Sequence, residues 1–327
     1  MVKSESSLAG SGRARRPLRL STGITLSVAF ILMCIIFIAL SADFASWANI
    51  KNIMRTLSVV GVVAIGETLV LLAGGVDISV GSVAAMAGVV ASMLWGAKTM
   101  NIWVCAGGGL LAGSLVGLIN GLVITQLKIN PLITTLGTFS IVRGLSFALT
   151  NGKMNQIVQP DFQFVGRGDV AGIPFSLILM AVLYIVFIFA LSQTRAGRNL
   201  YAVGGSAPAS RLAGIPANRY LLAVYVISGL FAAAGGLILA SQLAAGTPQA
   251  AAGLEFKVIS AVILGGTSLS GGKGMLFGTL VGVFILRTLD SGLVLAGVSS
   301  YWQEFARGAV LLLAVGFDQF RVRLERK

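Results

Sequence analysis

The chain has 327 residues, of which 56% are hydrophobic and only 11% are charged, and its mean hydropathy is +0.91. A soluble domain carries about 25% charged residues. The apolar excess is too large for a core of this size, so lipid must cover much of the surface. The composition therefore excludes an ordinary soluble protein and predicts an all-α, polytopic transmembrane bundle.

The rare residue types exclude several kinds of chemistry. The sequence has no histidine, which excludes a Ser-His nucleophile and a histidine-ligated zinc site. The two cysteines, Cys34 and Cys105, lie in apolar segments, so we interpret them as small buried side chains rather than a disulfide framework. We expect no cofactor, no metal and no covalent catalysis by this chain.

Ten apolar runs of about 20 residues predict ten transmembrane helices within residues 22–317. The first run follows a basic tail, residues 1–21; a cleaved signal peptide is the alternative, but the long basic region favours a retained helix. The eighth run is short and glycine-rich, and a second basic tail covers residues 318–327. The predicted spans are 22–41, 57–76, 79–98, 103–125, 131–150, 173–192, 219–240, 257–271, 275–297 and 302–317.

The net charge of +13 has two interpretations, a nucleic-acid-binding surface or a signal of membrane topology. An even number of spans places both termini on one side of the membrane. If both termini lie inside the cell, the interior segments hold fourteen basic residues and the exterior segments hold five. Because cytoplasmic segments are enriched in lysine and arginine, we predict cytoplasmic termini and no nucleic-acid partner. The five exterior residues are Lys51, Arg55, Lys98, Lys153 and Arg167.

The stretch VILGGTSLSGGKGMLFG, residues 262–278, has the glycines and the lysine of a phosphate-binding loop. A P-loop needs a glycine six residues before its lysine and a hydroxyl residue directly after it. Those positions hold Thr267 and Gly274, so we reject nucleotide binding by this chain. We interpret the stretch as a break between two short membrane helices, which must be buried in protein or line a cavity.

Glycines recur in two further patterns. The run Gly74–Gly81 matches Gly265–Gly272 at four of eight positions, and internal duplication and chance both remain open. Glycine also recurs every fourth residue, at 109, 113, 117 and 121 and again at 274, 278 and 282. Such ridges let membrane helices approach closely, so we expect helix packing at both.

Four longer motifs resemble the membrane permeases of ribose-type ABC sugar importers, the ribose/xylose/galactoside permease family. The likeness covers nearly the whole chain beyond the first twenty residues, in the same order and spacing. The motifs are ETLVLLAGGVDISVGSV (67–83), INPLITTLGTFSIVRGLSFALTNG (129–152), GRNLYAVGGSAPASRLAGI (197–215) and AVILGGTSLSGGKG (261–274).

The resemblance implies a transport function. Such permeases work as a pair of membrane subunits in the bacterial inner membrane, receive sugar from a periplasmic binding protein and are driven by a separate cytoplasmic ABC ATPase. The longest predicted cytoplasmic connection, 193–218, corresponds to the coupling segment that docks on the ATPase; topology alone would also explain it as a solvated basic loop. The expected coupling residues are Gly204, Gly205, Ala207, Pro208, Ala209, Arg211, Leu212 and Gly214.

Ionisable residues inside spans need a physical reason, because each costs about 2.5–3.5 kcal/mol to insert. Arg287 and Asp290, like Glu304 and Arg307, are three residues apart and are predicted to pair locally. Asp77 is predicted to cap the helix that follows its glycine run, with help from Ser79. Glu67 and Arg143 either pair across spans two and five or line the translocation path.

A permease should bind its cargo weakly, so small polar groups are expected along the path. For any single hydroxyl, a hydrogen bond to its own helix backbone is the competing interpretation. The candidate path residues are Glu67, Asp77, Ser79, Asn120, Asn130, Thr134, Thr138, Thr267 and Ser268, beside Thr135 and Ser140.

The sequence thus predicts a permease subunit that moves a small neutral sugar or polyol inward by alternating access, as a homodimer or a heterodimer surrounded by lipid. The first alternative is a secondary transporter driven by an ion gradient, in which Glu67, Asp77 and Asp290 would titrate or bind a cation. The second, an integral-membrane enzyme, is disfavoured because the eleven acidic residues are scattered along the chain.

Overall fold

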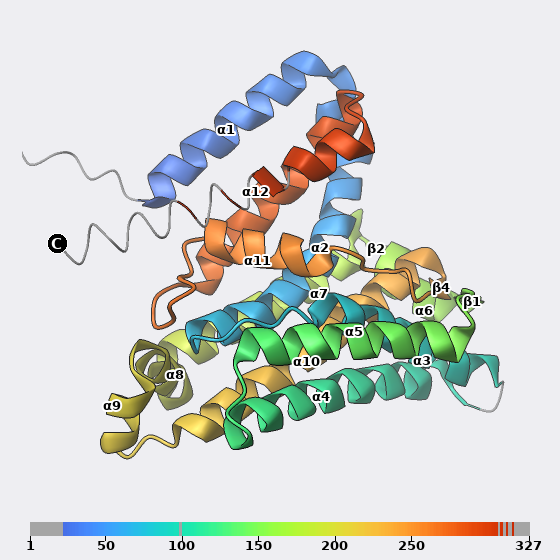
Figure 1. Ribbon diagram of the computed structural model, residues 1–327. Coiled ribbons are helices and arrows are strands. Elements are labelled where there is room, and N and C mark those ends of the chain that lie inside the picture. The colour runs from blue at the N-terminus through green and yellow to red at the C-terminus, as the bar shows by residue number, and fades with distance from the viewer. Residues whose placement is uncertain (1–21, 98–99, 307, 310–311, 313–315, 317–327) are drawn as a thin grey trace, which may run out of the picture.

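The computed structural model describes residues 22–97 and 100–306, together with residues 308, 309, 312 and 316, and describes side chains from Phe30 onward. Within these residues the protein is almost entirely helical, which confirms the all-α prediction (Figure 1). The N-terminal helices are α1 (Thr22–Leu40), the 3₁₀ turn η1 (Ala42–Ala45), α2 (Trp47–Leu72), α3 (Val80–Gly96), α4 (Ile102–Gln126) and α5 (Pro131–Thr150).

The part of the chain after α5 is also mainly helical and adds four strands of two residues each. Strand β1 pairs with β4, and β2 pairs with β3, both antiparallel. The elements are β1 (Asn155–Gln156), α6 (Pro160–Arg167), β2 (Asp169–Val170), β3 (Ile173–Pro174), α7 (Phe175–Gln193), α8 (Arg195–Gly205), α9 (Ala207–Leu212), α10 (Ala217–Leu243), β4 (Ala245–Gly246), α11 (Leu254–Leu264) and α12 (Leu276–Leu295).

Six of the described helices are long and apolar enough to cross a membrane, namely α2, α4, α5, α7, α10 and α12. Helix α11 has 11 residues, about 16 Å, and is too short to cross alone. The tenth predicted span, 302–317, is described only in part: residues 302–306 are helical, and beyond them the structure describes only residues 308, 309, 312 and 316. The number of ten spans therefore stays a prediction.

Helix α2 begins ten residues before the predicted span 57–76, so that boundary was wrong. Lys51 and Arg55 interrupt the apolar run, so hydropathy did not indicate the first turns of the helix. The Ser46 side chain caps those turns by accepting a hydrogen bond from the Asn49 amide, at 3.2 Å. The basic first turns reach the end of the bundle where the loop after α6 lies.

Helices α2 and α10 form the centre of the bundle. In α2, 89% of the most apolar window is buried, whereas the corresponding share in α7 is 22%, although α7 is the more hydropathic of the two. Large apolar side chains on α5 and α7, such as Ile133, Ile185 and Phe189, are exposed. Surfaces of this kind suit lipid or another apolar partner.

The glycine ridge of α4 packs against α10, as predicted. A methyl group on Gly113 would overlap the backbone oxygen of Gly229, and one on Gly117 would overlap that of Tyr225. At the second ridge, Gly278 and Gly282 bring α12 onto α11, but Gly274 precedes α12 and takes no part in the ridge. The prediction for Gly274 was wrong because the helix begins only at Leu276, after the break.

The loops segregate to two ends of the molecule. Helices α8 and α9 lie at the lower left of Figure 1, far from α6, β1 and β4 on the right. At the α6 end, Ile157 donates its amide to the Ala244 oxygen at 2.8 Å, beside the β1–β4 pair. This segregation agrees with the predicted alternation, because the segments at the α6 end are those assigned to the exterior.

Candidate functional site

The first glycine run opens a break between α2 and α3, and Asp77 fills it. The Asp77 carboxylate accepts hydrogen bonds from the Ser79 amide at 3.0 Å and from the Ser79 hydroxyl through one oxygen, and from the Ser228 hydroxyl of α10 at 2.8 Å through the other. All three residues are almost completely buried. Asp77 therefore satisfies donors that lipid could not, as a group at the start of a buried helix must.

Two further predicted path residues extend this set from α4 and α5. The Asn120 side-chain amide donates to the Ser79 hydroxyl at 3.0 Å, and its oxygen accepts from the Thr138 hydroxyl at 2.6 Å. We call Asp77, Ser79, Asn120, Thr138 and Ser228 the polar network. It joins the break to three helices, α4, α5 and α10. Ser228 was missed by the sequence reasoning, although a serine within an apolar span was its available signal.

Glu67 lies at the edge of the polar network and does not pair with Arg143. One Glu67 carboxylate oxygen accepts from the Asp77 amide at 3.2 Å; the other is buried and has no hydrogen-bond partner among the described residues. The Arg143 guanidinium instead donates to the backbone oxygens of Pro248 and Ala250, at 2.6 and 2.8 Å. The predicted pairing across spans two and five is therefore wrong, because α5 turns Arg143 toward the loop before α11.

The remaining candidate path residues lie outside the polar network, although the Thr134 backbone oxygen accepts from the Thr138 hydroxyl at 2.9 Å, and the Thr135 hydroxyl donates to the Val76 oxygen of the first break at 3.3 Å. Asn130 is exposed and caps α5 by accepting from the Leu132 amide at 2.9 Å. The Thr134 hydroxyl donates to the Asn130 backbone oxygen of its own helix at 3.1 Å. Thr267 and Ser268 belong to the second break, between α11 and α12, where both are buried.

The second break packs on the ends of α2 and α8. The Gly272 amide donates to the Leu72 backbone oxygen at 2.9 Å, and the Tyr201 hydroxyl donates to the Gly274 oxygen at 2.9 Å. A methyl group on Gly204 would overlap the Leu72 oxygen. The amide of Gly272, which a phosphate-binding loop would offer to its ligand, is thus occupied by the protein backbone. The close approach of three backbones accounts for the glycines here.

The expected coupling segment 193–218 forms two helices rather than one. Helix α9 covers the predicted Ala207–Leu212, and the preceding α8 was missed; Gly204 and Gly205 are its last residues. The Ser206 hydroxyl caps α9 by accepting from the Ala209 amide at 3.3 Å. Arg211 is exposed, and Leu212 is 93% exposed. Pro208 and Ala209 are also exposed, and Gly214 follows α9 in a left-handed turn with φ +80°.

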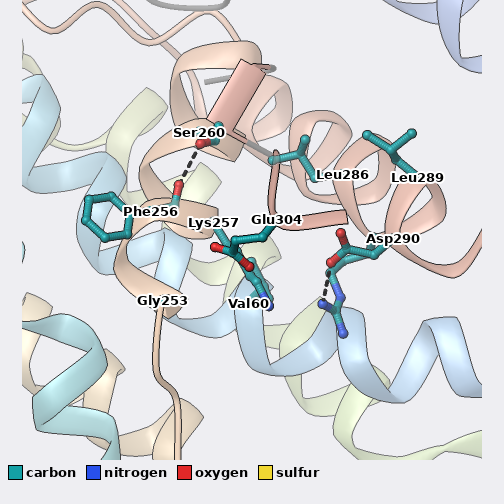
Figure 2. Close-up of a pocket in the computed structure, with 11 residues that line it drawn as sticks. Val60, Gly253, Phe256, Lys257, Ser260, Leu286, Leu289, Asp290 and Glu304 are labelled. Carbon is teal, nitrogen blue, oxygen red and sulfur yellow. Dashed lines mark hydrogen bonds and ion pairs between the residues drawn. The ribbon is translucent and has the colours of Figure 1, made fainter. Parts of the chain in front are cut away.

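A cavity of about 230 Å³ lies between α2, α11, α12 and the residues after 300. Figure 2 shows Lys257, Asp290 and Glu304 around it, with apolar side chains such as Phe256 and Leu286. Arg287 and Asp290 form the predicted ion pair at 3.0 Å. Arg307, the predicted partner of Glu304, lies outside the described residues. The cavity has two basic and two acidic lining residues, so it presents no net charge to a ligand.

An ion-pair cluster fastens the loops at the α6 end. The Asp169 carboxylate contacts Lys51 at 2.9 Å and Arg55 at 3.0 Å, both from the first turns of α2. The hydrogen bond from Lys51, supported by Arg55, holds the pKa of the Asp169 carboxyl below its ordinary value against a smaller effect of desolvation. Arg55 also donates to the Arg167 backbone oxygen at 2.8 Å.

The fold and the site together define a class of protein. Apolar helices surround a buried polar network at the first of two helix breaks, and the exposed helix α9 projects at one end. Polar and ionisable groups inside a membrane bundle mark transport proteins. The chain belongs to the permease family described as "Branched-chain amino acid transport system / permease component", whose family model matches residues 49–315.

Several curated relatives are similar over most of their length. The chain is 41% identical to the L-arabinose ABC transporter permease protein AraH of Azospirillum brasilense over 85% of this chain and 82% of the relative. It is 40% identical to the L-arabinose transport system permease protein AraH of Escherichia coli K12, over 93% and 91%. It is 37% identical to the ribose import permease protein RbsC of the same strain, over 89% and 92%. No solved structure matched the chain.

Proposed function

We propose that this chain is the membrane permease subunit of an ABC importer that carries a monosaccharide or a small polyol inward. Similarity to arabinose and ribose permeases over most of the chain supports this function, and makes pentoses the first cargo to test. The proposal includes ten spans with cytoplasmic termini, a second permease subunit, a periplasmic binding protein and the bacterial inner membrane. A separate ATPase supplies the energy, and the chain itself catalyses no reaction.

Helix α9 is the ATPase-docking element in this proposal. It projects at the end opposite α6, and it presents the exposed Arg211 and Leu212 beside each other. A basic group next to an apolar side chain is the kind of surface that a groove on a partner can hold. The Ser206 hydroxyl caps the start of α9 by accepting from the Ala209 amide, which stabilises the short helix that carries this pair.

The path is proposed to run beside the polar network, bordered on α5 by Thr138. That hydroxyl is only half-buried, whereas the other four members of the network are almost completely buried. Thr138 therefore connects the closed interior of the bundle with the exposed side of α5, where Ser140 also lies. Small hydroxyls at this position suit weak, transient hydrogen bonds to cargo.

The docking proposal is tested by a double variant, Arg211→Glu with Leu212→Asp, expressed with the ATPase and the binding protein. We expect co-purification of the ATPase and ATP-driven uptake of labelled arabinose or ribose to fall about tenfold or more. The matched control for ATPase recovery is Lys153→Glu with Met154→Asp, which also replaces an exposed basic residue and an exposed apolar residue by acidic ones, at the opposite end. Equal ATPase recovery with both variants would contradict docking through α9, and uptake abolished by an ionophore would contradict ATP as the energy source.

A further inference from the structure

Three chain segments that are distant in the sequence meet without side chains between them. They are the end of α2 at Leu72, the end of α8 at Gly204, and the second break at Gly271 and Gly272. The Gly272 amide is bonded to the Leu72 oxygen, and methyl groups placed on Gly204 or Gly271 would meet the backbone of the other segments at less than van der Waals distance. We call these residues, with Gly74, the glycine junction.

The junction stands between the exposed helix α9 and the core of the bundle. Helix α9 is joined to α8 through Ser206 alone, whose amide donates to the Ala202 oxygen at 3.0 Å. On the side of the bundle core, the junction includes Gly74, which lies at the start of the first break. Asp77 of that break follows Leu72 by only five residues. A displacement of α9 therefore reaches the polar network through a short and continuous set of contacts.

Backbone contacts of this kind transmit displacement well. Side chains can change rotamer and absorb a shift, whereas two backbones in contact at van der Waals distance must move together or separate. The Tyr201 hydroxyl adds a second attachment of α8, to the Gly274 oxygen on the way into α12. Helix α8 is thus fixed to both breaks, through Gly204 to α2 and through Tyr201 to the segment leading into α12.

We infer that Gly204 and Tyr201 are positioning residues that couple movement of the docking segment to the two helix breaks. The inference rests on the proposed function, because it needs an ATPase that moves α9. It assigns the glycine run 262–278 a mechanical role: the run receives the movement of α8 and passes it to α11 and α12. Neither residue is proposed to touch the ATPase or the cargo.

The test uses the complete transporter with Gly204→Ala, Tyr201→Phe and the control Gly107→Ala. Gly107 is also a helical glycine, in α4, outside the coupling segment and the proposed path; it is exposed, and nothing lies within 4 Å of the methyl that alanine would add. For each variant we would measure ATPase co-purification, binding-protein-stimulated ATP hydrolysis, thermal stability and sugar uptake. The decisive quantity is sugar transported per ATP hydrolysed, which a merely structural defect would leave unchanged.

We expect the transported sugar per ATP to fall about tenfold for Gly204→Ala and about threefold for Tyr201→Phe, with assembly retained and Gly107→Ala unchanged. If Gly204→Ala does not fold, Tyr201→Phe decides, since it removes only one hydroxyl. A wild-type ratio in an assembled Tyr201→Phe transporter would overturn the inference. Failure of the wild-type chain to bind any ABC ATPase would overturn the proposed function instead.

Discussion

The two helix breaks, 73–79 and 265–275, share part of their sequence and the beginning of their geometry. In each, a glycine in the left-handed region ends the preceding helix, Gly74 with φ +82° and Gly266 with φ +89°. Each glycine amide donates to a backbone oxygen three residues earlier, at 2.9 and 2.8 Å. This is the ordinary way to close the exposed end of a helix.

The turn that follows is also alike in the two breaks. The Ser79 amide donates to the Asp77 side chain at 3.0 Å, and the Ser270 amide donates to the Ser268 side chain at 3.3 Å. Both are local turns in which a side chain accepts from the amide two residues later. This similarity is compatible with duplication, but short glycine-rich sequences reach the same turn independently.

The breaks differ in what holds them. The first is held by a carboxylate that collects donors from other elements, among them Ser228 of α10. The second is held by backbone, through the bond from Gly272 to Leu72 and the contact with Gly204. At the first break, one carboxyl side chain does what close backbone packing does at the second. The same local turn can therefore be fixed in a membrane bundle in two physically different ways.

The largest expected effect follows from removing the carboxylate of the first break. Asp77→Ala leaves buried donors of Ser79 and Ser228 without an acceptor, so we expect a loss of about 3 kcal/mol or more in unfolding free energy, and loss of uptake. Ser268→Ala at the matching position should cost about 1 kcal/mol. Denaturant unfolding in detergent measures both.

The control for that comparison is Asp77→Asn, which keeps an acceptor oxygen and should recover much of the stability. If Asp77→Ala and Ser268→Ala cost the same, the contrast between a side-chain-held break and a backbone-held break would be wrong.

A smaller effect tests what the breaks share. Gly74→Ala and Gly266→Ala each force a left-handed residue to carry a side chain, while neither methyl would meet an atom closer than 4.0 Å. We expect each to cost about 1–2 kcal/mol, and the two costs to agree. Thermal unfolding of both variants under one condition checks this. A clearly larger cost at one break would mean that it is strained beyond the shared turn.

The smallest effect concerns the exposed ion pairs at the α6 end, which lie outside both breaks and should respond to acid. The pKa of Asp169 is lower in the folded protein than its reference value of 3.8, so its contribution is present above pH 3.8 and is lost as pH falls through the lower folded value. We expect a slight decrease in melting temperature over that acidic range. The decrease should be absent in Asp169→Asn, and its persistence there would assign it to other carboxylates.

The sequence predicted the elements whose causes are local. The span 131–150 matches α5 at both ends, because Pro131 starts the helix and Asn151 ends it in a left-handed turn. The short segment 207–212 matches α9, which a serine cap and a proline begin. The early start of α2 was not predicted, because hydropathy alone does not indicate a helix that continues through lysine and arginine.

The candidate site was only partly predictable. Asp77, Ser79, Asn120 and Thr138 were each named, but no spacing in the sequence shows that they form one network with Ser228. The opposite error arose for Glu67 and Arg143: pairing was one of two alternatives offered for them, whereas Arg143 donates to backbone oxygens of the loop before α11. Hydrogen bonds between distant segments depend on how each helix is rotated about its own axis. The sequence of an apolar span does not determine that rotation, because all its faces are similarly apolar.

By itself, the sequence determined that this chain is a helical membrane protein with breaks at two glycine runs, because hydropathy and the conformational freedom of glycine act over a few residues. Only the tertiary structure decided that α2 is central while the more hydropathic α7 faces outward, and that the second break rests on α2 and α8. The physical reason is that lipid and protein interior are about equally apolar, so burial within the bundle is set by close packing and hydrogen bonds rather than by hydrophobicity.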